Sequence, residues 1–187
     1  LYEIIISTYK NFSHSKIAPL YKIDNNKYIL ELFYGPTFAF KDYAMQFLGN
    51  LFSHCMQKKT NQLTILGATS GDTGAAAINA FKGKKNINVF ILHPHNKVSE
   101  VQRKQMTTNL DENIFNVAIE GNFDDCQKIV KELFLDKDIQ DKTSLTAINS
   151  INWARLMAQI VYYFWAYLQL EDKEVSFIVP SGNFGNV

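Results

Sequence analysis

One lysine of this chain stands in a setting that suits covalent chemistry. Lys41 follows the apolar run Phe38-Ala-Phe40 and opens a segment with helical apolar spacing. We expect these apolar neighbours to remove its ammonium partly from solvent. Desolvation favours the neutral amine, which is the form that attacks carbonyl carbons. The ordinary alternative for any lysine is a solvated surface group. Lys41 is therefore the candidate for Schiff-base chemistry.

A glycine-rich loop, Gly67-Ala-Thr-Ser-Gly-Asp-Thr-Gly74, joins a predicted strand to a predicted helix. The start of a helix offers free N–H groups and a positive dipole end, and Thr69, Ser70 and Thr73 add hydroxyl donors. Such a loop suits a carboxylate or a phosphate. It has neither the Gly-Lys pair of a Walker A loop nor the G-x-G-x-x-G pattern. The alternative is a plain turn in which Asp72 only caps the helix.

Two further segments have anion-binding character. The segment Pro180-Ser-Gly-Asn-Phe-Gly-Asn186 follows a predicted strand, and its backbone amides could form an anion nest. Asn152 and Arg155 are three residues apart, so they share one face at the start of a predicted helix. With Ser150 they could hold a phosphate, since a guanidinium bonds it with two parallel hydrogen bonds. Capping by Ser150 beside a solvated arginine is the alternative.

The lysine and the three anion-binding segments together outline a site for pyridoxal phosphate and an anionic substrate. The protein would supply a lysine for the cofactor aldehyde, a nest for its phosphate and a pocket for an amino-acid carboxylate.

Hydrophobic periodicity predicts the elements that would position these residues. Short apolar runs alternate with helical periods, which is typical of an α/β protein with a mainly parallel sheet between two helical layers. The predicted strands cover residues 28–33, 63–66, 88–92, 115–119 and 175–179. The predicted helices cover residues 40–55, 72–82, a segment capped by Asn122 or Asp124, and 153–168. Residues 136–144 are predicted to form a surface loop.

Composition narrows the class of protein. The 187 residues are 47% hydrophobic and carry a net charge of +1, which excludes a disordered polymer and argues against a nucleic-acid partner. Residues 156–168 are too short to span a bilayer, and we expect no secretory signal, because residues 1–10 lack a basic start and a small-residue cleavage site. Cys55 and Cys126 are isolated and are expected to be buried thiols in a reducing cytoplasm. His93 and His95 lack a third ligand, so no metal site is expected.

Six segments, taken in order, resemble the threonine synthase family of the fold type II, tryptophan-synthase-β-like, pyridoxal-phosphate enzymes. They are Leu32-Phe-Tyr-Gly-Pro-Thr-Phe-Ala-Phe-Lys-Asp42, the loop 67–74, His93-Pro94 with Ser99 and Gln102, Glu120-Gly-Asn-Phe-Asp-Asp125, Asn149-Ser-Ile-Asn-Trp-Ala-Arg155 and the segment 180–186. Each is a weak signal alone, and the set is specific.

The resemblance implies roles for individual residues. Lys41 would be the Schiff-base lysine, and Asp72 would lie close to the cofactor ring. The cofactor phosphate would be held by Gly182, Asn183, Phe184, Gly185 and Asn186. The loop that takes the substrate carboxylate would include Thr69, Ser70, Gly71, Asp72 and Thr73. The substrate phosphate would be bound by Ser150, Asn152 and Arg155.

The implied reaction converts O-phospho-L-homoserine and water to L-threonine and phosphate, with pyridoxal 5'-phosphate as cofactor. Residues 1–40 would belong to a large domain and the entry to the active site, and residues 41–150 to a small domain with the parallel sheet. Residues 151–187 would be a helix and strand leading to the cofactor-phosphate loop. The chain starts at Leu1 and stops at that loop, so we expect part of a longer protein with little activity alone.

Two other functions remain open at this point. The chain could belong to another fold type II enzyme that acts on serine, threonine or cysteine, or it could bind the cofactor or another anion without turnover. The segment 149–155 argues against the first, because those substrates carry no γ-phosphate. The oligomeric state is open between a monomer and a homodimer.

Overall fold

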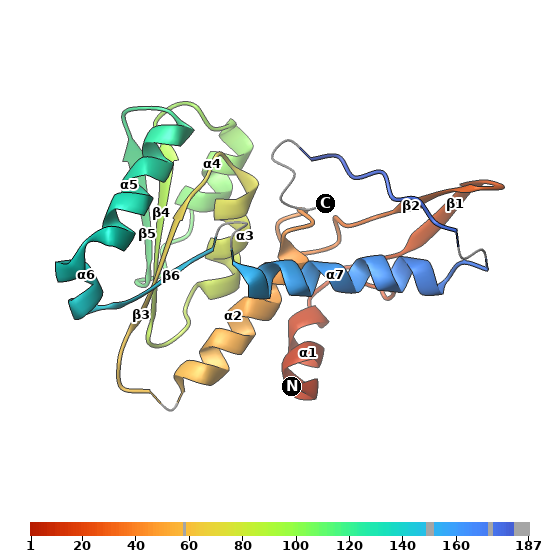
Figure 1. The fold of residues 1–187 in the computed structure, drawn as a ribbon, viewed down its shortest axis with the longest axis horizontal. Helices are drawn as coiled ribbons and strands as arrows, with labels where there is room; N and C mark the ends of the chain where they lie inside the picture. Colours follow the sequence, from red (N-terminus) through yellow and green to blue (C-terminus); the bar gives the residue numbers. More distant parts are fainter. Residues whose placement is uncertain (58, 149–151, 172–173, 182–187) are drawn as a thin grey trace.

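The computed structural model describes residues 1–57, 59–148, 152–171 and 174–181 (Figure 1). Its strands are β1 (Leu20–Asp24), β2 (Lys27–Leu30), β3 (Leu63–Ala68), β4 (Ile87–Pro94), β5 (Ile114–Ile119) and β6 (Ser144–Ala147). Its helices are α1 (Tyr2–Tyr9), α2 (Asp42–Met56), α3 (Asp72–Phe81), α4 (Glu100–Thr107), α5 (Phe123–Leu135), α6 (Lys137–Lys142) and α7 (Trp153–Leu168).

A four-stranded parallel sheet in the order β5-β4-β3-β6 forms the centre of the molecule. Helices α5 and α6 lie on one side of it, and α2, α3 and α4 lie on the other (Figure 1). This confirms the predicted three-layer αβα architecture. Because all four strands are parallel, the segments that follow β3 and β4 leave the sheet at the carboxyl ends of the strands. This is where ligands of open α/β sheets bind.

Small residues bring α3 close to its neighbours in the core. Ala75, Ala76 and Ala77 are almost fully buried in a cluster that includes side chains of α2, β3 and β4. A Cβ added to Gly49 of α2 would lie 2.3 Å from the carbonyl oxygen of Ala80, so α2 and α3 approach too closely there for any side chain. This tight packing fixes α2 and α3 relative to each other.

Helix α7 and the N-terminal segment form a second packed region. Helix α7 extends away from the sheet toward the β1–β2 hairpin (Figure 1). Tyr162 of α7 packs edge-on against Tyr43 of α2, which also stacks edge-on with Phe12. The buried side of α7 carries Arg155, Ala158, Gln159, Tyr162 and Ala166. Its large apolar stripe is mostly exposed among the described residues, at Trp153, Met157, Ile160, Val161, Phe164, Trp165 and Leu168.

Several predictions about the elements are wrong. Residues 174–181 contain no strand, because no neighbouring strand among the described residues pairs with them; Phe177 instead packs on Tyr163 of α7. Residues 136–144 are not a loop but contain α6, which Asp136 caps by accepting from the Ile139 N–H. Residues 28–33 contribute only β2, which pairs antiparallel with β1 outside the main sheet.

The cysteine prediction is half right. Cys126 is buried between α5 and the sheet, but Cys55 is exposed near the end of α2. The predicted cap of α5 is confirmed at Asn122, whose side chain accepts from the N–H groups of Asp124 and Asp125.

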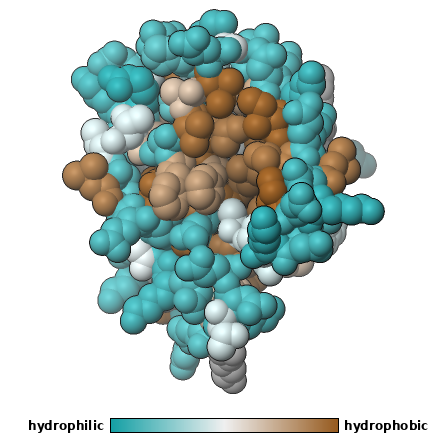
Figure 2. Space-filling model, turned by 90° about the vertical axis from the view of Figure 1, so that its left-hand side faces the viewer, coloured by the Kyte–Doolittle hydropathy of each residue, from teal (hydrophilic) through white to brown (hydrophobic). Residues whose placement is uncertain are grey.

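The outer side of the sheet carries an apolar area. Figure 2 shows this area surrounded by hydrophilic side chains on the side where α5 and α6 lie. The exposed large apolar side chains of β5 and α5 are Phe115, Val117 and Leu135. Of the helices in the described ranges, none is both long and apolar enough to cross a membrane.

Candidate active site

The turn before Lys41 is held by a buried carboxylate. Asp42, the first residue of α2, is 0% exposed and accepts two hydrogen bonds of 2.7 Å, from the backbone N–H and the hydroxyl of Thr37. A Cβ on Gly35 would lie 2.4 Å from the Asp42 Cβ, so only glycine fits there. Phe38 has a φ of 61°, a left-handed conformation that is rare for an aromatic residue. The Asp42–Thr37 contacts hold this strained turn in place.

Burial raises the pKa of the Asp42 carboxyl, and its hydrogen bonds from Thr37 act in the opposite direction. The N-terminal end of α2 also favours a negative charge at this position. The carboxyl thus has the surroundings of a structural anchor for the turn.

Lys41 points to the start of α3. Its Nζ lies 2.7 Å from Oδ2 of Asp72, and the two side chains are 14% and 42% exposed. The ammonium also lies over the Phe40 ring, 4.3 Å from the centroid. As predicted, the amine is largely removed from solvent. The ion pair brings together two candidate residues that are far apart in the sequence.

The loop between β3 and α3 is shaped by Thr69. This side chain is buried, and its hydroxyl accepts from the N–H groups of Gly71 and Gly74 and donates to the Gly71 carbonyl. Within the described ranges, the backbone N–H groups of Ser70, Asp72 and Thr73 make no hydrogen bond. These are the free donors that the start of a helix offers to an anion.

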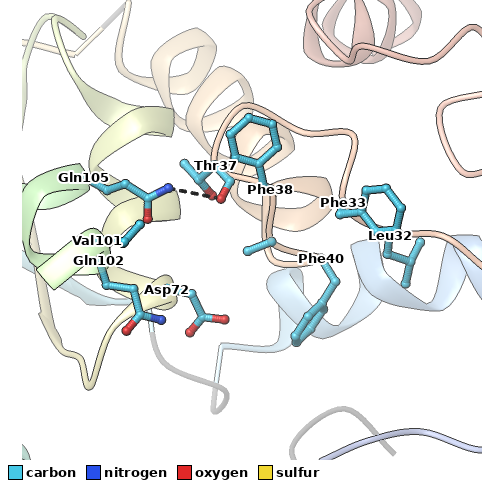
Figure 3. A pocket seen from close by; sticks show the side chains of 10 residues that line it. Leu32, Phe33, Thr37, Phe38, Phe40, Asp72, Val101, Gln102 and Gln105 are labelled. Carbon is cyan, nitrogen blue, oxygen red and sulfur yellow. Dashed lines mark hydrogen bonds between the residues drawn. The ribbon is translucent and has the colours of Figure 1, made fainter. Parts of the chain in front are cut away.

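A cleft of about 550 Å³ adjoins Asp72. Figure 3 shows its walls, formed by the turn before Lys41 on one side and by α4 on the other. The lining residues are Leu32, Phe33, Thr37, Phe38, Ala39, Phe40, Asp72, Val101, Gln102 and Gln105. Gln105 Nε2 donates to the Thr37 carbonyl across the cleft at 3.4 Å. The sequence marked Gln102 only as part of a motif and did not identify Gln105, because α4 lacks a clear apolar period.

The start of α7 uses its polar groups differently. Asn152 caps α7 by accepting from the N–H groups of Ala154 and Arg155, and its Nδ2 donates to the Ala147 carbonyl. Arg155 is 3% exposed and donates to the Ile148 carbonyl at 3.1 Å. Burial lowers the pKa of Arg155, and the charge of Asp72 opposes this shift.

The remaining predicted site residues lie outside the described residues. They are Ser150 and the segment from Gly182 to Asn186. In the described ranges, no group of three or more His, Cys, Asp or Glu side chains is arranged to hold a metal ion.

Comparison with known protein families identifies the family of this chain. Residues 16–187 match the family described as pyridoxal-phosphate dependent enzyme. The chain belongs to this family. Lys41 and the cleft beside Asp72 lie within the matched residues, as does the whole parallel sheet.

Similar proteins are threonine synthases. The threonine synthase of Pseudomonas aeruginosa is 56% identical over 187 residues, which cover 99% of this chain and 40% of that protein. The threonine synthase of Saccharomyces cerevisiae is 46% identical, and the match covers 100% of this chain and 40% of that protein. The chain therefore spans about 40% of the length of these curated relatives.

Solved structures give the same result. The pyridoxal-phosphate-bound threonine synthase of Brucella melitensis superposes with a TM-score of 0.89 at 49% identity, covering 98% of this chain and 40% of that one. The yeast threonine synthase superposes with a TM-score of 0.86 at 46% identity, covering 98% and 39%. Diaminopropionate ammonia lyase of Escherichia coli, at 15% identity and a TM-score of 0.60, shares the fold.

Proposed function

We propose that this chain is the lysine-bearing part of a threonine synthase, which converts O-phospho-L-homoserine and water to L-threonine and phosphate. The observation that carries the proposal is the 2.7 Å contact of Lys41 with Asp72 at the start of α3. A cleft adjoins this contact, and so do loop N–H groups that make no hydrogen bond within the described ranges. An amine and an anion cradle within one site suit an amino-acid substrate. The threonine synthase relatives support the choice of substrate.

The residues present fit pyridoxal 5'-phosphate as cofactor. The Lys41 side chain is largely desolvated, and the partly exposed Asp72 carboxylate and the Phe40 ring lie beside its amine. Lys41 and Asp72 would hold the cofactor, with its phosphate on the segment of Gly182, Asn183, Phe184, Gly185 and Asn186. When bound, the cofactor supplies an electron sink for carbanions next to the amino group.

The chain's own residues would divide the remaining work. The amine of Lys41 would move protons at Cα and Cβ of the substrate. The loop that contains Thr69, Ser70, Gly71 and Thr73 would bind the substrate carboxylate, with Thr69 shaping the loop from within.

The substrate phosphate would be held by Ser150, Asn152 and Arg155 at the start of α7. Holding the leaving phosphate by a guanidinium and a helix terminus favours elimination. Arg155 is buried and donates to the Ile148 carbonyl in this structure. To bind the substrate phosphate, its guanidinium would have to break this hydrogen bond and turn toward the substrate.

The arrangement of the complete protein is part of the proposal. Residues 1–40 would belong to the large domain, 41–150 to the small domain, and 151–187 to the return into the large domain. We place the protein in the cytoplasm as a monomer or homodimer, with a small-molecule substrate and neither nucleic acid nor membrane as partner.

Reduction with borohydride tests the cofactor assignment. The complete protein is incubated with pyridoxal phosphate and reduced, and the labelled peptide is mapped by mass spectrometry. We expect the label on Lys41, and the exposed Lys97 serves as the reference for random labelling. Labelling that is scattered over surface lysines, or absent, would refute the role of Lys41.

Phosphate release tests the substrate assignment separately. The complete protein is expected to release phosphate from O-phospho-L-homoserine and not from O-phospho-L-serine. The opposite preference would indicate a fold type II enzyme of another specificity. Labelling of Lys41 without release from either compound would indicate a binding protein without turnover.

A further inference from the structure

Gln102 lies in the cleft in a fixed orientation. Its Oε1 accepts from the Ser99 hydroxyl at 2.9 Å, and its backbone N–H donates to the same hydroxyl oxygen at 3.3 Å. Ser99 is the N-cap residue of α4, so the side chain is tied to the start of its own helix. With Oε1 engaged, the amide presents its Nε2 donors to the cleft.

The anion-binding loop holds the other side of this amide. A Cβ added to Gly71 would lie 2.3 Å from Gln102 Oε1 and 2.6 Å from Nε2, so the loop backbone packs directly on the amide group. Figure 3 shows the amide turned toward the Asp72 carboxylate, with its nitrogen on that side. The absence of a side chain at Gly71 is what allows this contact.

We propose that Gln102 is a substrate-binding residue whose Nε2 donates a hydrogen bond to the substrate α-carboxylate. This deepens the proposed function and rests on it. Gln102 and Asp72 line the same cleft. The adjoining N–H groups of Ser70, Asp72 and Thr73 have no hydrogen-bond partner within the described ranges, so this loop still has donors for the same carboxylate. A neutral amide binds a carboxylate without adding a charge that would compete for the Lys41–Asp72 ion pair.

The position of Gln102 explains why it binds the carboxylate end and not the phosphate end. It lies on α4, against the loop after β3, whereas the proposed phosphate ligands Asn152 and Arg155 begin α7. Ser99 is a positioning residue in this arrangement, because its hydroxyl keeps Oε1 from turning into the cleft.

Two ligands that cannot turn over test the proposal in the complete, cofactor-loaded protein. L-homoserine and L-homoserinamide carry no phosphate leaving group, and they differ only in carboxylate against carboxamide. Their dissociation constants are measured by calorimetry for the wild type, Gln102→Met and Gln102→Glu. Gln57→Met is the matched control, since this glutamine is exposed at the far end of α2.

We expect the wild type and Gln57→Met to prefer L-homoserine. Gln102→Met should weaken L-homoserine binding about tenfold, the loss of one hydrogen bond to a charged group. Gln102→Glu should reverse the preference, because a carboxylate repels L-homoserine and accepts from the carboxamide of L-homoserinamide. Ser99→Ala keeps Gln102 and should reduce the preference about threefold.

An unchanged preference for the carboxylate in both Gln102 variants would overturn the proposal. So would equal weakening of both ligands together with a lowered unfolding midpoint, which would show a structural role only. Failure of the proposed function is a separate result, because it is seen in the wild type as no phosphate release from O-phospho-L-homoserine.

Discussion

The two halves of the candidate site use similar polar residues in opposite ways. At the sheet edge, Asp72 is 42% exposed, and the loop N–H groups beside it have no partner among the described residues. At the start of α7, Asn152 bonds to the Ala147 carbonyl and to two N–H groups of the first turn. Arg155 is buried and donates to the Ile148 carbonyl. The sheet half is therefore ready to bind a ligand, whereas the α7 half stabilises its own helix start.

The physical cause lies in how each half is supported. The loop after β3 receives its shape from Thr69 inside it and from the tightly packed α3, so its outer N–H groups need no partner among the described residues. Helix α7 packs on α2 through Tyr162 and Tyr43, and its cap comes from its own Asn152. The loop at the carboxyl end of β3 therefore keeps hydrogen-bonding groups for a ligand. The start of α7 uses its own polar groups to stabilise the helix.

Replacement of the amine in the sheet half has the largest expected effect. Lys41→Ala removes the proton-transfer group and the attachment point, so we expect phosphate release from O-phospho-L-homoserine to fall about 10³-fold or more. The rate is measured in the complete protein. Lys97→Ala is the control, because this lysine is exposed. A loss below tenfold would contradict the assignment of Lys41.

The sequence was sufficient for the elements that carry this half. Strands β3, β4 and β5 and helices α2 and α3 are predicted within a few residues, because their apolar spacing is clear in the sequence. Gly83 follows the end of α3 and has a positive φ of 66°, which suits a glycine just past a helix. The ion pair between Lys41 and Asp72 was not predictable, since it depends on the tertiary approach of α2 to α3.

The sequence misled where local pattern and tertiary packing differ. The apolar stripe of α7 correctly predicted a helix, but the side packed on α2 carries Ala158 and Tyr162, and the stripe is mostly exposed in the described ranges. Arg155 lies off that stripe and is buried for this reason. Hydrophobic periodicity predicts a helix with an apolar and a polar face, but it does not predict which face packs against the rest of the molecule.

Arg155→Lys examines the α7 half and has the next largest expected effect. Lysine keeps the charge but lacks the planar fork that holds a phosphate with two hydrogen bonds. We expect KM for O-phospho-L-homoserine to rise about tenfold, with a smaller change in kcat. Steady-state kinetics of the complete protein measures both. An unchanged KM would show that Arg155 has a structural role only. Ligand binding would then be assigned to the sheet half and not to Arg155.

Asp42→Asn tests the support beneath Lys41 through its pH dependence. Burial raises the folded-state pKa of Asp42 above that of the unfolded chain. Between these two values the folded state keeps a proton that the unfolded state has released, so stability falls as pH rises. Asparagine does not titrate and lacks this contribution.

The measurement is urea unfolding of both proteins from pH 4 to pH 7. Relative to Asp42→Asn, the wild type should lose stability as pH rises from about 4, the region of an unfolded aspartate. Asp138→Asn on the exposed side of α6 provides the matched control. Parallel curves for the wild type and Asp42→Asn would contradict the raised pKa of this carboxyl in the folded state.

A matched pair of helix caps gives the smallest expected effect and separates folding from binding. Asn122 caps α5 on the far side of the sheet and Asn152 caps α7 at the candidate site, each by accepting from two backbone N–H groups. Replacement of either by alanine should lower the free energy of unfolding by about 1 kcal/mol. Only Asn152→Ala should also raise KM for O-phospho-L-homoserine. If the two variants have equal KM values, Asn152 acts as a cap alone, and phosphate binding at the start of α7 must depend on other groups.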